Sequence, residues 1–169
     1  MFAIVDIEAS GSKYPQGRII DLAILLHDGH EIVREYQTLV NPGHPITDFY
    51  QKLTGITNQM LERAPSFQDI AEEVFDLLKD AHFVAHNVSF DYEFMRRELA
   101  AAGFTLDSRR LCSFKLAQKY LPGHQKYGLS SLAADLGIPM DRVHRAYDDA
   151  KATARVLEII LEKYQIAAG

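Results

Sequence analysis

The sequence has little of what marks secreted, membrane-spanning or nucleic-acid-coating proteins. It contains one cysteine, Cys112, so no disulfide can form within the chain. No apolar run reaches the ~18 residues that span a bilayer, and the N-terminus lacks the basic segment of a signal peptide. Only 18 Lys and Arg stand against 23 Asp and Glu, for a formal net charge of -5, which speaks against a broad basic surface for nucleic acid. We therefore expect a soluble, cytoplasmic protein with no membrane partner.

The residues that are present suffice for one packed domain. Of the 169 residues, 47% are hydrophobic, and no repeat, low-complexity tract or linker divides them. We expect a single domain over residues 1–169, with its last element ending near Tyr164.

Apolar patterns predict strands in the first third of the chain and alternating helices and strands after it. Strands are expected over residues 2–8, 18–26, 30–40, 82–85 and 109–112, and helices over 66–79, 89–101, 114–120, 129–136 and, as the longest, within 144–164. The Asp28-Gly29 pair predicts an antiparallel hairpin, and Ser66 is placed to cap a helix. This order predicts an α/β sheet with antiparallel and parallel pairs.

The first strand ends in two acids that share a face. Side chains two residues apart in a strand point the same way, so Asp6 and Glu8 continue the face of Phe2 and Ile4. Ligands of open α/β sheets lie beyond the carboxyl ends of the strands. The pair is therefore a candidate site, and the alternative is a strand that emerges into water.

Asp149 is a second unusual acid. At about 100° per residue it shares a stripe with Val156 and Ile160, which must face the sheet, whereas Asp148 projects with Arg155 toward solvent. A carboxylate at a core-facing position needs a cation or several donors. The alternative is a first-turn acid that complements the helix dipole.

Asp91 repeats this pattern, and a histidine completes the set. Asp91 lies on the apolar stripe of its helix, where Asn87 or Ser89 is available as the cap, and the alternative is again an acid favoured by the dipole. His144 precedes Asp149 by five residues. We expect it on the loop that enters the last helix, from which it can reach the same region.

The four acids and the histidine predict a divalent-metal site, because they come from the ends of elements that converge on one edge of a sheet. Oxygen ligands without cysteine favour Mg²⁺ or Mn²⁺ over zinc. Two such ions would balance the clustered carboxylates, and a two-ion site is a device for in-line displacement at phosphorus.

Three segments resemble, in order and context, the motifs of the DEDDh 3′–5′ exonucleases, a group similar to the proofreading epsilon subunit of bacterial DNA polymerase III. They are Asp6-Ile7-Glu8, residues 86–91 (His-Asn-Val-Ser-Phe-Asp) and residues 144–149 (His-Arg-Ala-Tyr-Asp-Asp). The resemblance covers nearly the whole chain. It implies a ribonuclease H-like α/β fold, with a mixed five-stranded sheet flanked by helices.

The resemblance implies a role for each candidate residue. Asp6 would bridge two Mg²⁺ or Mn²⁺ ions. Glu8 and Asp149 would complete the site of the ion that holds the attacking water, and Asp91 would serve the other ion. His144 would be the general base that takes the proton of the water.

The resemblance also implies contacts to substrate, which we expect from Ile7, Ala9, Ser10, Leu53, Ile56, Asn87 and Phe90. Ala9 stands where the family commonly has threonine, which leaves backbone N–H groups to bind the terminal nucleotide. Leu53 and Ile56 would supply an apolar surface for the terminal bases, and the alternative is that both are helix core residues.

The leading hypothesis is a metal-dependent 3′–5′ exonuclease that releases nucleoside 5′-monophosphates from single-stranded or frayed DNA, in replication or repair. The alternatives are an exoribonuclease that trims RNA, a non-catalytic module that binds 3′ ends, and a structural domain of a larger assembly. With four acids assigned to metal, the remaining surface is nearly neutral. It predicts a local grip aided by scattered cations, namely Lys13, Lys115, Lys126 and Arg145. A DNA polymerase or another fused or docked domain is the expected protein partner.

Overall fold

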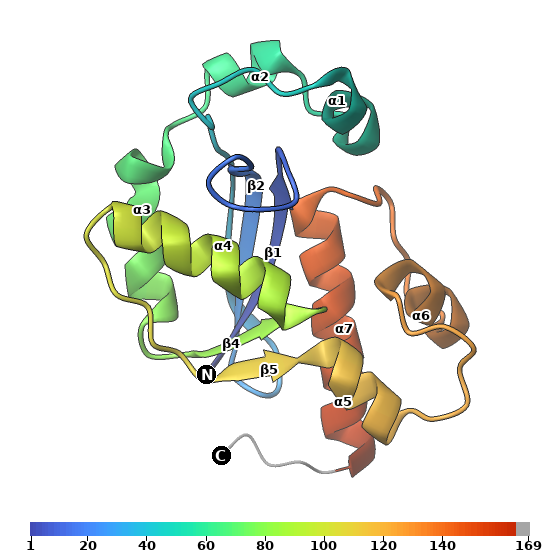
Figure 1. Ribbon diagram of the computed structural model, residues 1–169. Helices are drawn as coiled ribbons and strands as arrows, with labels where there is room; N and C mark the ends of the chain where they lie inside the picture. Colours follow the sequence, from blue (N-terminus) through green and yellow to red (C-terminus); the bar gives the residue numbers. More distant parts are fainter. Residues whose placement is uncertain (165–169) are drawn as a thin grey trace.

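The computed structural model describes residues 1–164 (Figure 1). Its strands are β1 (Phe2–Ala9), β2 (Ile19–His27), β3 (Ile32–Leu39), β4 (His82–Ala85) and β5 (Arg110–Cys112). Its helices are α1 (Asp48–Thr54), α2 (Asn58–Glu62), α3 (Phe67–Leu78), α4 (Val88–Ala101), α5 (Ser113–Tyr120), α6 (Leu129–Leu136) and α7 (Ala146–Tyr164). Each predicted element is present, with its ends within two residues of the prediction. The last five residues of the predicted domain, 165–169, lie outside the described residues.

The five strands form one mixed sheet in the order β3-β2-β1-β4-β5. β2 pairs antiparallel with both β1 and β3, whereas β4 pairs parallel with β1 and β5. The predicted hairpin is confirmed: the carboxylate of Asp28 accepts from the backbone N–H groups of His30 and Glu31 and so closes the turn. β1 lies at the centre of the sheet, so its carboxyl end is surrounded by structure.

Helices cover both faces of the sheet, and the two faces of β1 differ in their partners (Figure 1). Ala3, Val5 and Ile7 pack in one core cluster with residues of α3 and α4. Phe2 and Ile4 pack in another cluster with α7. The predicted alternation of β1 is therefore confirmed, and it directs the face of Asp6 and Glu8 toward the helix that carries Asp149.

Helices α3 and α4, which cover one face of the sheet, begin in different ways. Ser66 caps α3 as predicted, because its hydroxyl accepts from the backbone N–H of Asp69. At α4, the prediction that Asn87 or Ser89 supplies the cap is wrong. Asn87 occupies the N-cap position, but its backbone is left-handed (φ 70°), and its side chain makes no capping hydrogen bond. The exposed Asn87 side chain is thus left for other contacts.

The loop after β1 is closed by the approach of two glycines. A Cβ atom on Gly17 would lie 2.6 Å from the backbone of Gly11, so the two segments touch through main chain alone. The Ser10 N–H donates to the carbonyl of Arg18, and the Arg18 N–H donates to the Ser10 hydroxyl. Residues 12–16 therefore form a loop whose two ends are fixed beside the carboxyl end of β1.

The remaining helices form two flanks of the sheet (Figure 1). α1 and α2 lie beyond the carboxyl end of β1 and share a small core with Ile20 of β2. α5 and α6 pack against the outer side of α7. Within residues 1–164, no helix is both long and apolar enough to cross a membrane.

Candidate metal centre

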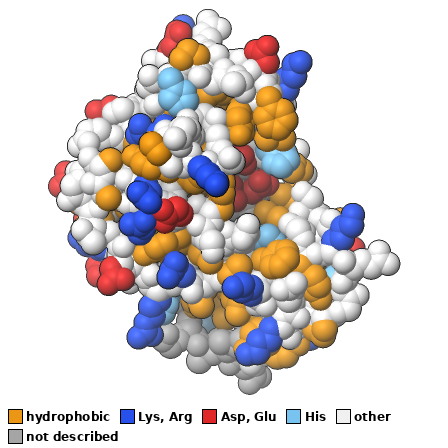
Figure 2. All heavy atoms as spheres, in the orientation of Figure 1, with side chains coloured by type: hydrophobic (Ala, Val, Ile, Leu, Met, Phe, Trp, Pro, Cys, Tyr) orange, Lys and Arg blue, Asp and Glu red, His pale blue; other side chains and the backbone are white. Residues whose placement is uncertain are grey.

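Three elements bring the predicted acids to one place. β1 supplies Asp6 and Glu8 at its carboxyl end, α4 supplies Asp91 in its first turn, and α7 supplies Asp149 in its first turn. Figure 2 shows acidic side chains at the bottom of a hollow in this face, with a histidine and hydrophobic side chains around them. The predicted convergence on one edge of the sheet is what the structure shows.

Two of these acids hold buried oxygens that lack a protein partner. Asp6 Oδ2 and Asp149 Oδ1 are inaccessible to solvent and have no hydrogen-bond partner among the described residues. The residue Asp149 is 8% exposed and Asp91 is 5% exposed. Asp91 differs in that its Oδ1 accepts from the backbone N–H of Ile7, at 3.1 Å. A buried carboxylate oxygen without a donor is costly unless a cation binds it.

His144 lies beside Glu8 and Asp149. One possible ligand atom from each of the three residues lies within 4.8 Å of the others. His144 is on the exposed loop before α7, as predicted, and its backbone is left-handed (φ 62°). The structure thus brings the histidine of the third motif to the acids of the first and third motifs.

Burial and mutual repulsion raise the pKa of every acid in the cluster. Burial is the largest cause for each of them, and the neighbouring carboxylates add to it. The pKa of Asp6 lies well above its usual value. The pKa rises to about 8 for Glu8 and to about 6 for Asp149. Asp91 also reaches a pKa of about 8, although the hydrogen bond from Ile7 lowers it. Full ionisation of the cluster is therefore unfavourable unless positive charge is added.

The donor set fits divalent cations. Carboxylate oxygens are the ligands that Mg²⁺ and Mn²⁺ prefer, and Asp6 and Asp149 each offer one that the protein leaves unpartnered. Cations would also offset the burial and the repulsion that raise the pKa values of Glu8 and Asp91. Asp6, Glu8, Asp91 and Asp149 are thus the residues that would hold such ions.

A fifth carboxylate, Asp21, was not predicted from the sequence. It stands directly opposite Glu8 in the pairing of β1 with β2 and is 5% exposed. Its Oδ2 accepts from Arg145 Nε at 2.9 Å and from the backbone N–H of Ala146 at 3.1 Å. Arg145 is therefore engaged in an ion pair and is not free to grip a strand as expected. An acid within the apolar run of residues 19–27 is the signal that could have identified Asp21.

Two of the backbone N–H groups between Ile7 and Ser10 are already used. The N–H of Ile7 donates to Asp91, and that of Ser10 donates to Arg18. The side chains of Ile7 and Ala9 are buried, with 4% and 7% of their surface exposed. The expectation that backbone N–H groups of this segment are free to bind the terminal nucleotide is therefore wrong for Ile7 and Ser10, because Asp91 of α4 and Arg18 at the end of the loop accept from them.

The other predicted contact residues differ in accessibility. Ile56 is fully buried in the small core beneath α1 and α2, so its side chain offers no surface to a base. Leu53 and Phe90 are each 38% exposed, and Asn87 is exposed beside the first turn of α4. Of this group, Leu53, Phe90 and Asn87 remain candidates for contact with a strand.

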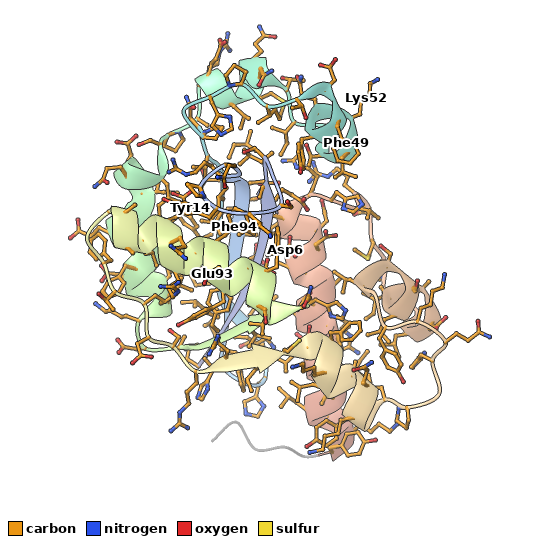
Figure 3. All side chains as sticks on the ribbon, viewed as in Figure 1. Asp6, Tyr14, Phe49, Lys52, Glu93 and Phe94 are labelled. Atoms are coloured by element: carbon orange, nitrogen blue, oxygen red, sulfur yellow. The ribbon has the colours of Figure 1, made fainter. Side chains whose placement is uncertain are left out.

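A pocket lies beside the acids, between α4 and the loop after β1. Its volume is about 470 Å³, and its lining residues are Ser12, Lys13, Tyr14, Asn87, Ser89, Phe90, Glu93 and Phe94. The ring of Phe94 packs edge-on against Tyr14, and its centroid lies 5.0 Å from that of Phe90. In the view of Figure 3, Tyr14 and Phe94 lie on one side of Asp6, and Phe49 and Lys52 of α1 lie on the other. The aromatic lining by Tyr14 and Phe94 was not predicted from the sequence.

Comparison with known proteins agrees with this geometry. The sequence model of the RNase_T family, described as an exonuclease, matches residues 3–157. The chain belongs to the RNase_T exonuclease family. The predicted DEDDh resemblance is thereby confirmed, and so is the expectation of an enzyme that hydrolyses nucleic acid. DEDDh exonucleases depend on divalent metal, as the carboxylate cluster of this RNase_T domain suggests.

Two relatives of this RNase_T domain match over nearly its whole length. The 3′-5′ exonuclease DinG of Bacillus subtilis (strain 168) is 39% identical over 164 residues, which cover 96% of this chain and 18% of DinG. DNA polymerase III subunit epsilon of Aquifex aeolicus (strain VF5) is 36% identical over 169 residues, covering 99% of this chain and 84% of the subunit. The chain therefore spans less than a fifth of the length of its DinG relative.

Solved structures share the RNase_T fold. Exonuclease X in complex with 5′ overhanging duplex DNA matches with a TM-score of 0.79 and 28% identity, over 99% of this chain and 95% of that one. The nuclease domain of 3′hExo, a DEDDh family member bound to rAMP, matches with a TM-score of 0.80 and 23% identity, over 96% of this chain and 92% of that one. The predicted ribonuclease H-like fold is confirmed.

Proposed function

We propose that this chain hydrolyses single-stranded or frayed DNA from the 3′ end and releases nucleoside 5′-monophosphates. The observation that carries the proposal is the pair of unpartnered, buried oxygens of Asp6 and Asp149, with His144 beside them. DNA is favoured as substrate because the epsilon relative is a DNA polymerase subunit and the structural neighbour exonuclease X is bound to DNA.

The acids and the histidine have separate tasks in this proposal. Two Mg²⁺ or Mn²⁺ ions held by Asp6, Glu8, Asp91 and Asp149 would supply Lewis acidity toward the phosphate and make water nucleophilic near neutral pH. His144 takes the proton of the attacking water at a ring nitrogen. Imidazole is the side chain best suited to this task near neutral pH, and the exposed position of His144 allows the proton to pass on to solvent.

The walls of the site suit an unpaired strand end. Phe90 and Leu53 expose apolar surface, and the half-buried Tyr14 extends the Phe90 surface along the pocket, with the buried Phe94 packed against both rings. Bases stack on aromatic side chains without sequence preference. Lys13 lines the same pocket and offers positive charge to a phosphate. In Figure 2, Lys and Arg side chains lie scattered over this face, which fits a local grip rather than a long basic track.

The test uses matched 5′-labelled oligonucleotides: single-stranded DNA, single-stranded RNA, and duplexes with a paired or a mismatched 3′ end. We expect Mn²⁺-dependent release of mononucleotides, fastest from single-stranded DNA and from the mismatched end. Asp6→Asn serves as the inactive control. Faster digestion of RNA than of DNA would show that RNA, and not DNA, is the preferred substrate. No release from any oligonucleotide, with unchanged binding of 3′ ends by Asp6→Asn, would leave a non-catalytic binding module.

A larger assembly is also proposed. The epsilon relative is a subunit of DNA polymerase III, and the DinG relative is much longer than the matched segment. These relatives favour a DNA polymerase or a fused domain as partner, with a role in replication or repair. Co-purification of the full-length protein with a polymerase subunit tests this. A cytoplasmic location stays a prediction, which fractionation of cells would check.

A further inference from the structure

Asp21 is a buried charge that the proposed reaction does not use. It lies within the site, opposite Glu8 on the neighbouring strand, and it is 5% exposed. Isolation of a carboxylate from water is unfavourable unless specific partners compensate for it. The contacts of Asp21 therefore indicate its task.

Asp21 holds the two residues that follow His144. Its Oδ2 accepts from the Arg145 guanidinium and from the Ala146 backbone N–H. The Ala146 N–H belongs to the first turn of α7, where N–H groups lack an acceptor within the helix. Asp21 thus caps α7 from the neighbouring strand, and its negative charge faces the positive end of the helix dipole.

The turn at His144 needs such support. A left-handed backbone (φ 62°) is unfavourable for a residue that carries a Cβ atom. In this conformation a ring nitrogen of His144 lies within 4.8 Å of an oxygen of Glu8 and one of Asp149. Fixing residues 145 and 146 fixes the turn and thereby the direction of the histidine ring.

We infer that Asp21 and Arg145 are positioning residues that hold His144 where it acts as the base. The inference rests on the proposed function, because it needs His144 to take part in the reaction. Arg145 Nε is 2.9 Å from Asp21 Oδ2, with 23% of the arginine side chain exposed. This ion pair links strand β2 to the loop that carries His144.

The same loop contains a matched control. Arg142 Nε is also 2.9 Å from a carboxylate oxygen, Oδ2 of Asp148, but the arginine side chain is 58% exposed. Asp148 lies next to Asp149 in sequence yet is absent from the cluster of Glu8, His144 and Asp149. Arg142→Ala therefore removes an ion pair of equal length from the same loop without touching Asp21 or Ala146.

The experiment measures kcat with the p-nitrophenyl ester of thymidine 5′-monophosphate, a substrate that carries one nucleotide, at saturating Mn²⁺. Asp21→Ala and Arg145→Ala are compared with Arg142→Ala, each in the wild-type and in the His144→Ala background. We expect Asp21→Ala and Arg145→Ala to lower kcat by about tenfold or more, with KM and the half-saturating Mn²⁺ concentration within about twofold. Arg142→Ala should leave kcat within about twofold.

The His144→Ala background separates positioning from other roles. If Asp21 and Arg145 act through His144, replacing either residue in the His144→Ala background should lower kcat by less than about twofold. The inference would be overturned if Asp21→Ala lowered kcat by the same factor in the His144→Ala background as in wild type, because Asp21 would then act on the metal site or on the fold. If His144→Ala retains wild-type kcat, both the base assignment and the inference fall.

Asp21→Asn, a further variant, and Arg145→Ala control for effects on folding. Asp21→Asn keeps an acceptor for the Ala146 N–H while it removes the charge, so we expect a kcat between those of wild type and Asp21→Ala. Arg145→Ala leaves Asp21 in place as a cap. Circular dichroism checks that Arg145→Ala and Asp21→Asn are folded. If both keep wild-type kcat while His144→Ala has a lower kcat, the positioning inference is wrong and the assignment of His144 as the base stands.

Discussion

The bottom of the site and its mouth are held in different ways. Asp6, Asp91 and Asp149, here called the floor, come from a central strand and from the first turns of two helices packed on the sheet. His144 and Phe90, here called the rim, are exposed at the entrance to α7 and on α4. The floor keeps its charges out of water and so needs cations, whereas the rim remains accessible to a strand and to protons. Substitutions on the floor should therefore abolish hydrolysis, whereas substitutions on the rim should impair either proton transfer or strand binding.

The largest effect is expected from Asp149→Asn on the floor. Loss of a cation ligand should lower kcat about a thousandfold, equivalent to several kcal/mol of transition-state stabilisation. The matched control is Asp148→Asn at the adjacent position, which should change kcat by less than about threefold because Asp148 pairs with the exposed Arg142. Steady-state kinetics with Mn²⁺ on single-stranded DNA measures both. Equal losses in the two variants would contradict the assignment of Asp149.

On the rim, His144→Ala should lower kcat by about a hundredfold to a thousandfold, the usual range for a lost general base. Its melting temperature should stay within about 2 °C of wild type, because an exposed loop residue contributes little to stability. The pH dependence of kcat and a thermal melt check both statements. A variant that keeps the wild-type acidic limb of the pH profile would show that another group takes the proton.

A smaller effect is expected from Phe90→Ala, also on the rim. Removing one stacking surface should raise the KM for single-stranded DNA about tenfold and leave kcat within about twofold. Val33 on β3 is a matched control, since it is also an exposed hydrophobic residue but lies on the edge strand, outside the pocket beside the acids. An equal KM change in Val33→Ala would mean that Phe90 acts through general hydrophobicity and not as a contact.

The smallest effect concerns the stability of the metal-free protein. Folding raises the pKa of Glu8 from 4.5 to about 8, mainly through burial. A group with a raised folded-state pKa favours folding at low pH, and this contribution is lost as the pH rises through the folded value. In EDTA, the melting temperature of wild type should therefore fall relative to Glu8→Gln between about pH 4.5 and pH 8, by several degrees. Saturating Mn²⁺ should reverse the order at pH 8, and an unchanged order would argue against a cation at Glu8.

Much of the floor could be predicted from residue periodicity. The face of β1 that ends in Asp6 and Glu8, and the stripe of α7 that carries Asp149, follow from repeats of two and of about 3.6 residues. These rules operate within one element, and the described structure confirms both. Asp148 is more covered than its place on the solvated stripe predicts, with 14% of its side chain exposed, and Arg142 from the segment before α7 pairs with it.

What could not be predicted depends on pairing between elements. Asp21 gains its place from the register of β2 against β1, and the N–H group of Ile7 is used by Asp91, a partner distant in sequence. The burial of Ile56 depends on how α1 and α2 meet β2. Local patterns carry no information on such contacts. The acids of the floor could therefore be predicted from the sequence, whereas the hydrogen bonds and the ion pair around them could not.

The contact between Gly11 and Gly17 separates two kinds of sequence change. Because these glycines meet backbone to backbone, a side chain at Gly17 would push the loop away from the end of β1 and disturb Asp6 and Glu8 with it. Residues 12–16 lie beyond this contact, and Ser12, Lys13 and Tyr14 line the pocket. We therefore expect substitutions at Ser12 and Lys13 to alter the pocket and leave the acids in place, whereas Tyr14 also packs against Phe94 and the core.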